Sequence, residues 1–128
     1  MSSPEQKIYE KFERALKRAL PKGRYHLQRI ETSTGTGIPD VYFRYERHVC
    51  WIETKTIEYA VSKEQYAWAC KEMTAGGQCW VLTVVDGELK FYGFDSDMVG
   101  VRLGKYLREN PVIFCLSIEA WLTTYGSY

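Results

Sequence analysis

The sequence predicts an α/β fold in which a mixed β-sheet is flanked by helices. The chain opens with an amphipathic stretch over residues 5–20, which indicates a helix packed on a core. A second helix pattern, with a capping box formed by Ser62 and Gln65, interrupts runs of β-branched and aromatic residues that are typical of strands. Residues 80–85 are continuously apolar, as expected for a central strand buried on both faces.

The expected elements follow from local signals along the chain. The hydroxyl of Ser3 can cap the first helix, and Pro21 disfavours its continuation beyond Leu20. Polar residues at 46–48 predict the turn of a β-hairpin. The further expected elements are strands over 25–31, 41–45, 49–56, 78–85, 88–94 and 111–116, and helices over 62–74, 98–109 and 118–125.

The bulk composition is that of one soluble globular domain. The chain has 128 residues, of which 45% are hydrophobic and 26% charged, and these values exclude a disordered chain. Its apolar runs are too short to cross a bilayer, and its first residues lack a signal-peptide pattern, so we expect no membrane association and an intracellular, cytoplasmic location. The four cysteines form no C-x-x-C pair, so free thiols are expected.

The predicted hairpin brings two carboxylates and one ammonium group together. Strand alternation places Glu53 and Lys55 on one face, and an antiparallel return places Asp40 beside Glu53. Carboxylate oxygens suit Mg²⁺ or Mn²⁺, and the carbonyl of Thr54 could add a further ligand. Such a site hydrolyses phosphodiesters, with Lys55 stabilising charge on the phosphate. A surface ion pair is the plainer alternative, but partly buried strands make unpaired charges costly and favour the metal site.

The basic residues are concentrated near the N-terminus. Residues 1–30 carry eight Lys and Arg against three Glu, a charge of +5, whereas the whole chain carries +1. This distribution suits a protein that holds phosphates on one side, although a solvated amphipathic helix has the same pattern. The candidate nucleic-acid-binding residues are Lys7, Lys11 and Arg14 on the first helix and Lys63 at the start of the second.

The hairpin motif resembles a known nuclease signature. Pro39-Asp40 followed by Glu53-Thr54-Lys55 resembles the PD-(D/E)xK nucleases. With Gly37-Ile38 before it, and Ser62, Gln65 and Trp68 after it, the pattern is more narrowly similar to the virus-type replication-repair nuclease (VRR-NUC) domain. This resemblance covers roughly the N-terminal three quarters of the chain. It implies a restriction-endonuclease-like core over about 1–94, within a single domain over 1–128 that ends in an α/β extension over about 95–128. It also makes a viral origin one option.

The resemblance also implies two further site residues. An acid on the first helix commonly completes the metal site in this superfamily, which makes Glu5 a candidate ligand beside Asp40, Glu53 and Thr54. A helix cap or dipole partner is the structural alternative for Glu5. The matching glutamine lies close to the active site, which adds Gln65 to the catalytic candidates Asp40, Glu53 and Lys55. The capping box is its structural alternative.

Taken together, the motif and the resemblance imply a Mg²⁺-dependent DNA endonuclease. The implied substrate is branched DNA, as for dimeric Holliday junction resolvases, and the implied partner is a second copy of the chain. Aromatic residues outside the core motif could form that dimer interface or could cap the sheet of a monomer: Phe114, Trp121, Tyr125 and Tyr128. Two alternatives stay open: a sequence-specific restriction or homing endonuclease, and a non-enzymatic DNA-binding module.

Overall fold

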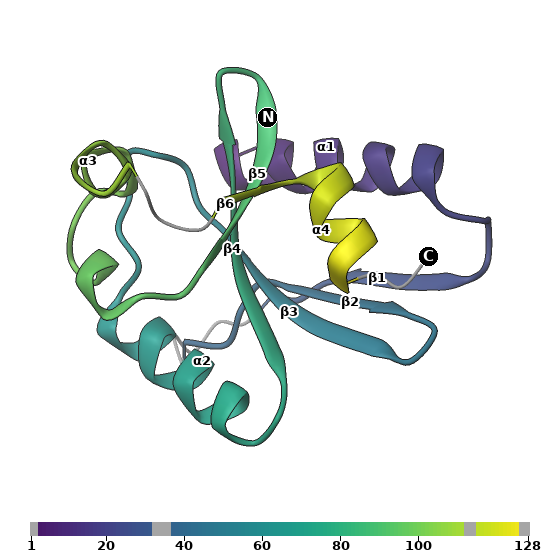
Figure 1. The fold of residues 1–128 in the computed structure, drawn as a ribbon, viewed down its shortest axis with the longest axis horizontal. Coiled ribbons are helices and arrows are strands. Elements are labelled where there is room, and N and C mark those ends of the chain that lie inside the picture. Colours follow the sequence, from purple (N-terminus) through teal and green to yellow (C-terminus); the bar gives the residue numbers. More distant parts are fainter. Residues whose placement is uncertain (1–2, 32–36, 112–114, 126–128) are drawn as a thin grey trace.

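A computed structural model describes residues 3–31, 37–111 and 115–125 and confirms the mixed α/β fold (Figure 1). The six strands form one sheet in sequence order, in which β3 and β4 are parallel and the other neighbours antiparallel. The elements are α1 (Pro4–Ala19), β1 (Tyr25–Arg29), β2 (Val41–Tyr45), β3 (His48–Thr54), α2 (Lys63–Thr74), β4 (Gln78–Val85), β5 (Glu88–Gly93), the 3₁₀ turn η1 (Ser96–Met98), α3 (Leu103–Glu109), β6 (Cys115–Ser117) and α4 (Ile118–Tyr125).

The parallel pair requires the crossover that α2 supplies, because parallel strands cannot be joined by a tight turn. The capping box predicted for this helix is confirmed. The Gln65 N–H donates to the Ser62 hydroxyl at 3.1 Å, and the Ser62 N–H donates to the Gln65 side-chain oxygen at 2.8 Å. The helix therefore begins at a position that its own side chains define.

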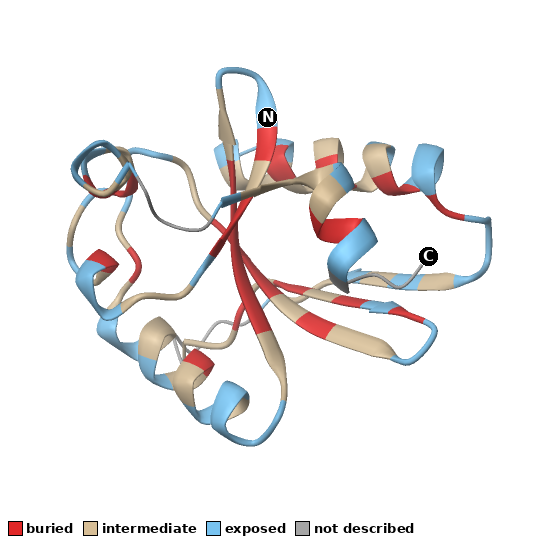
Figure 2. Cartoon of the chain, viewed as in Figure 1, coloured by how far each residue is buried: buried red, intermediate tan, exposed pale blue. Residues whose placement is uncertain are grey.

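The main core lies between α1 and one face of the sheet. Ile8, Phe12 and Leu16 form the buried stripe of α1. Leu82 belongs to this core, whereas its neighbour Val81 belongs to a smaller cluster with residues of η1 and α3. Because successive strand residues face opposite ways, the two clusters cover opposite faces of the sheet. In Figure 1, α1 and α2 lie on opposite sides of β4, and Figure 2 shows buried residues running along β4 between them.

The C-terminal segment contributes to this main core. β6 pairs with the edge of β5, and Trp121 of α4 stacks on Phe91 with ring centroids 4.1 Å apart. Trp121 is 1% exposed, so the expectation that it is available for a dimer interface is wrong. The structure favours the alternative, in which this residue caps the sheet. Phe114 and Tyr128 lie outside the described residues, and Tyr125 is the last residue of α4.

Several expected boundaries differ from the structure. The single helix expected over 98–109 is wrong: it is replaced by η1 and α3, with Gly100 between them at a φ of 76°, a left-handed conformation that ends helical geometry. The last strand is Cys115–Ser117, and it ends one residue beyond the expected 111–116; residues 112–114 of that expectation lie outside the described residues. Within the described ranges, no helix is long and apolar enough to cross a membrane.

Candidate active site

The β2–β3 hairpin brings Asp40 and Glu53 side by side. Val41 pairs with Ile52 across the two antiparallel strands, so the residues immediately outside this pair, Asp40 and Glu53, also oppose each other. Val41 and Ile52 belong to the core beneath α1. Alternation therefore directs Glu53 to the other face of the sheet, together with Lys55, as the sequence predicted, and Asp40 lies beside Glu53 immediately before β2.

Thr54 holds the Asp40 carboxylate. Its backbone N–H donates to Asp40 Oδ1 at 2.8 Å, and its hydroxyl donates to Oδ2 of the same carboxylate. Thr54 is 1% exposed, so neither donor is readily exchanged for water. These contacts give Thr54 a positioning role that the sequence did not indicate, whereas its carbonyl as a metal ligand stays a prediction.

Glu53 is held from two directions. The Gln65 side-chain amide donates to Glu53 Oε2 at 3.1 Å, and Lys55 Nζ lies 3.8 Å from the same oxygen. Gln65 thus uses its oxygen in the capping box and its nitrogen on Glu53. The two interpretations of Gln65 drawn from the sequence describe one side chain with two simultaneous contacts.

Burial and mutual repulsion disfavour the state in which both carboxyl groups of this pair are charged. Burial, reinforced by the charge of Asp40 and opposed by that of Lys55, raises the pKa of Glu53 to about 8. Burial also raises the pKa of Asp40, against the hydrogen bonds from Thr54 and the nearby charge of Arg29. The pair therefore retains a proton near neutral pH unless a cation balances its charge.

The donor set fits a hard divalent cation. Asp40 and Glu53 offer adjacent carboxylates whose repulsion a cation would relieve, and Mg²⁺ completes its shell with water and substrate oxygens. Among the described residues, no group of three or more His, Cys, Asp or Glu side chains could hold a metal. Glu5 is close enough for its charge to raise the pKa of Glu53, but it does not join such a group. Its role as a ligand stays a prediction.

The two carboxylates open onto a cleft of about 420 Å³. Arg29, at the end of β1, and Glu31 line this cleft, and the sequence analysis assigned neither of them a role. The available signal was the pairing of β1 with β2, which sets Arg29 opposite Val41, next to Asp40. The sequence pattern of a strand does not show which end of that strand lies next to an active site. The lining residues are Arg29, Ile30, Glu31, Gly37, Ile38, Asp40, Glu53, Ser62 and Gln65.

Gly37 joins this cleft to the first turn of α2. Its φ is 82°, and a Cβ at this position would lie 2.4 Å from the backbone oxygen of Glu64. Only glycine allows this approach without moving the helix. The Gly37 loop and the residue before Gln65 are therefore in direct backbone contact.

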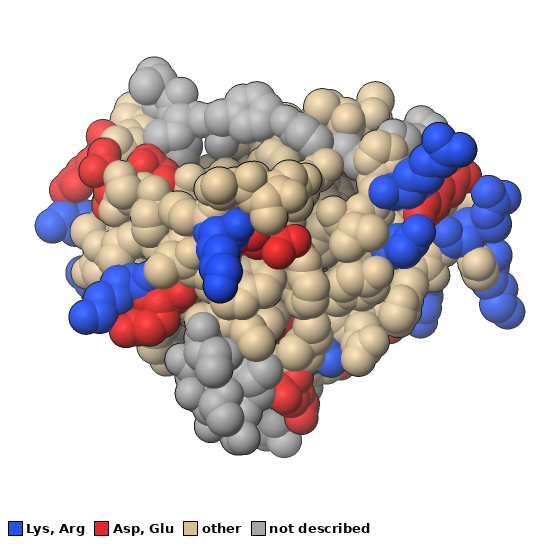
Figure 3. All heavy atoms as spheres, turned by 90° about the horizontal axis from the view of Figure 1, so that it is seen from below, with Lys and Arg blue, Asp and Glu red and all other residues tan. Residues whose placement is uncertain are grey.

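The candidate nucleic-acid-binding residues lie outside the Asp40–Glu53 cleft. Lys7, Lys11 and Arg14 line a separate hollow of about 500 Å³ with Val84, and Lys63 is exposed at the first residue of α2. Figure 3 shows one face of the molecule, on which positive and negative groups are interspersed, mostly at its margins. On this face the described residues form no continuous basic stripe.

Comparisons with known proteins give a similarity among solved structures. No protein-family model matches the chain, and no curated protein matches it. Among solved structures, the chain is similar to Hjc of Archaeoglobus fulgidus, described as a Holliday junction resolvase from an archaeal hyperthermophile. The similarity covers 76% of this chain and 98% of that chain, with a TM-score of 0.48 and 16% sequence identity.

Proposed function

We propose that this protein is a metal-dependent nuclease that hydrolyses phosphodiester bonds in DNA. The observation that supports this proposal is the Asp40–Glu53 pair, in which Glu53 is buried and Asp40 is half-buried. The pair opens onto a cleft and has Lys55 Nζ 3.8 Å from Glu53. A pair that is costly to keep charged in the free protein is suited to a bound cation.

Each residue has a distinct task in the proposed reaction. Asp40 and Glu53 hold Mg²⁺ or Mn²⁺, which when bound lowers the pKa of water and neutralises charge on the phosphate. Thr54 keeps the Asp40 carboxylate oriented, and Gln65 does the same for Glu53. Lys55 donates hydrogen bonds to the phosphate oxygens as negative charge grows there in the transition state.

The burial of the charged groups counts against the surface-pair alternative. The side chains of Lys55 and Glu53 are 14% and 8% exposed, whereas an exposed pair gains little and has no need of such burial. A buried pair with a raised glutamate pKa is more typical of a functional site. The non-enzymatic alternative predicts binding without cleavage, which the experiment below separates.

The finer substrate assignment rests on the motif resemblance from the sequence. We propose branched DNA as the substrate and a homodimer as the active form, because symmetric cuts in a four-way junction match a two-fold symmetric enzyme. A sequence-specific restriction or homing endonuclease is the second candidate, and it would cut linear DNA at a defined site.

A cleavage panel tests the proposal. Linear, flapped and four-way DNA are incubated with the protein in Mg²⁺, Mn²⁺ or excess chelator, and light scattering reports the oligomeric state. We expect cleavage in either metal, none in chelator, and none for Asp40→Asn or Glu53→Gln. Glu109→Gln, a change at a surface glutamate with a 60% exposed side chain, is the matched control and should leave cleavage intact. Full activity in chelator or in either carboxylate variant would disprove the assignment.

A further inference from the structure

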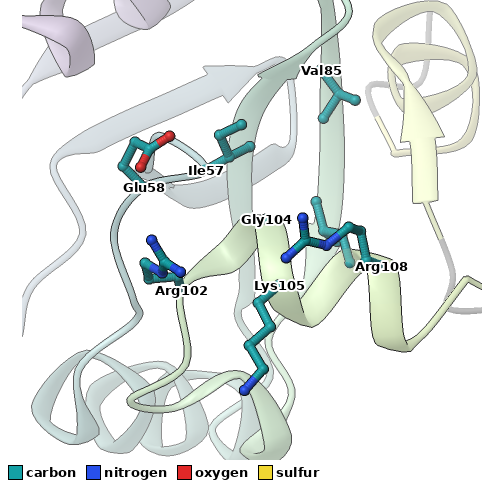
Figure 4. Close-up of a pocket in the computed structure, with 8 residues that line it drawn as sticks. Ile57, Glu58, Val85, Arg102, Gly104, Lys105 and Arg108 are labelled. Carbon is teal, nitrogen blue, oxygen red and sulfur yellow. The ribbon is translucent and has the colours of Figure 1, made fainter.

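A second cavity, of about 390 Å³, lies against α3 and is rich in positive charge (Figure 4). Arg102, Lys105 and Arg108 line it, and their three-residue spacing places them on one side of the helix. Ile57, Val85 and Leu107 supply apolar walls, and Glu58 is the acid in the lining. This cationic cavity is separate from the Asp40–Glu53 cleft and has no part in the reaction proposed above.

The two arginines of the cationic cavity are available to a ligand. Both are exposed, and within the described part of the chain their side chains make no ion pair or hydrogen bond. Figure 4 shows the guanidinium groups of Arg102 and Arg108 on two sides of the cavity, with Lys105 extending away. Lys105 makes only a long contact with Glu109, at 3.9 Å between two exposed side chains.

Backbone contacts fix the cavity relative to the candidate active site. The Gly104 N–H donates to the Ile57 carbonyl and the Leu103 N–H to the Tyr59 carbonyl, both at 2.9 Å. A Cβ on Gly104 would lie 3.2 Å from the Ile57 oxygen, so α3 sits tightly on this loop. Ile57 follows Lys55 by two residues, a separation of at most about 7 Å along the chain. Arg102 and Arg108 therefore belong to a segment that is hydrogen-bonded to the loop directly after Lys55.

A second group of cations flanks the same strand end on the other face of the sheet. Val84 and Val85, the last residues of β4, face opposite ways. Val85 lines the cationic cavity, and Val84 lines the hollow of Lys7, Lys11 and Arg14. Positive side chains thus stand on both sides of the end of β4, where a polyanion longer than one phosphate can contact both groups.

We propose that the cationic cavity binds backbone phosphates of the DNA next to the cleavage site, through Arg102 and Arg108. Guanidinium groups bind phosphate oxygens in a bidentate manner and cannot lose their charge at working pH. Contacts to the backbone position a strand without reading its sequence. This inference rests on the proposed function, because it assigns the flanking part of the same substrate.

The test is a binding titration of the full chain with labelled duplex and four-way DNA over a range of salt concentrations. Ca²⁺ replaces Mg²⁺, and fluorescence anisotropy reports binding. Affinity falls as salt rises, so the slope of log K against log salt is negative. The double variant R102Q/R108Q should make this slope less steep by about 1.8, since each phosphate contact that is lost reduces its magnitude by about 0.9. For equal affinities at 1 M salt, this corresponds at 0.1 M salt to an affinity weaker by about sixtyfold. Arg47→Gln, at an exposed arginine in the β2–β3 turn, is the matched control and should leave the slope unchanged.

A variant that is expected to raise DNA affinity controls for loss of affinity caused by unfolding. Glu58→Gln removes the acid in the cavity lining and should raise DNA affinity, which damage to the fold would not do. An unchanged slope in R102Q/R108Q, with the fold verified by circular dichroism, overturns the proposal. Loss of inorganic phosphate binding without any loss of DNA binding also overturns it, because the cavity would then be a small-anion site. If no DNA is cleaved in Mg²⁺ but R102Q/R108Q still makes the salt slope less steep by about 1.8, the cavity assignment stands and the nuclease assignment fails.

Discussion

Glu53→Gln should change the stability of the metal-free protein in a pH-dependent way. The pKa of Glu53 is raised from 4.5 to about 8 in the folded chain, mainly by burial and then by the charge of Asp40. The folded state therefore binds a proton between these pH values that the unfolded state has released. This contribution to stability is fully present below pH 4.5 and is lost as the pH rises to about 8.

The size of the effect follows from the shift. A difference between 4.5 and about 8, at about 1.4 kcal/mol for each unit, gives roughly 5 kcal/mol lost across the window. The E53Q variant has no carboxylate to titrate at this position and should lack this slope. At pH 8 the variant should therefore be the more stable protein, although it lacks a candidate metal ligand.

Urea unfolding without metal at several pH values between about 5 and about 8, followed by circular dichroism, measures this difference. Glu109→Gln is the control and should keep the slope of the parent, because its side chain is exposed. Adding Mg²⁺ at the upper end of this range should stabilise the parent by about 2.7 kcal/mol at about one hundred times its Kd, and should stabilise E53Q much less. A parent profile that is flat across the range, or an equal slope in E53Q, would refute the reasoning.

Three other changes test single contacts. Lys55→Ala should lower kcat far more than DNA affinity in a single-turnover assay, because Lys55 acts on charge that develops in the transition state; equal losses would make it a ground-state anchor. Gly37→Ala should destabilise the protein by at least about 1–2 kcal/mol in urea and slow cleavage, because the added Cβ would clash with Glu64 at a positive φ; normal stability and rate would contradict this. Trp121→Ala should cost about 3–5 kcal/mol, because its ring stacks on Phe91 in the core; a near-neutral change that alters only the oligomeric state would restore the interface interpretation.

The sequence predicted the parts of the fold that depend on local pattern. The hairpin, the buried central strand 78–85 and the capping box at Ser62 all follow from alternation, apolar runs and side-chain capping, and each is confirmed. The meeting of Asp40 and Glu53 was predictable for the same reason, since antiparallel pairing fixes which residues oppose each other. Local sequence patterns were therefore sufficient to predict that Asp40 and Glu53 lie next to each other.

The remaining features depend on contacts between distant segments. Arg29 lines the cleft because β1 pairs with β2, and no periodicity within residues 25–29 indicates that. The sequence leaves two alternatives open for Trp121, a dimer interface or a cap on the sheet, because nothing near it in sequence shows that it stacks on Phe91 of β5. The break at Gly100 was missed because an isolated glycine is compatible with a helix until tertiary contacts select a positive φ.

Three segments of the chain contact one another at the candidate site. The Gly37 loop presses on the backbone of Glu64, the next residue Gln65 both caps α2 and binds Glu53, and Glu53 lies against Asp40 at the end of the same loop. Each of these contacts involves backbone or a buried side chain. The loop that follows Lys55 is hydrogen-bonded to the start of α3. The cationic cavity is therefore connected to the candidate site through this loop. These contacts hold a buried and a half-buried carboxylate next to each other, with a lysine 3.8 Å from one of them, despite the cost of their charge.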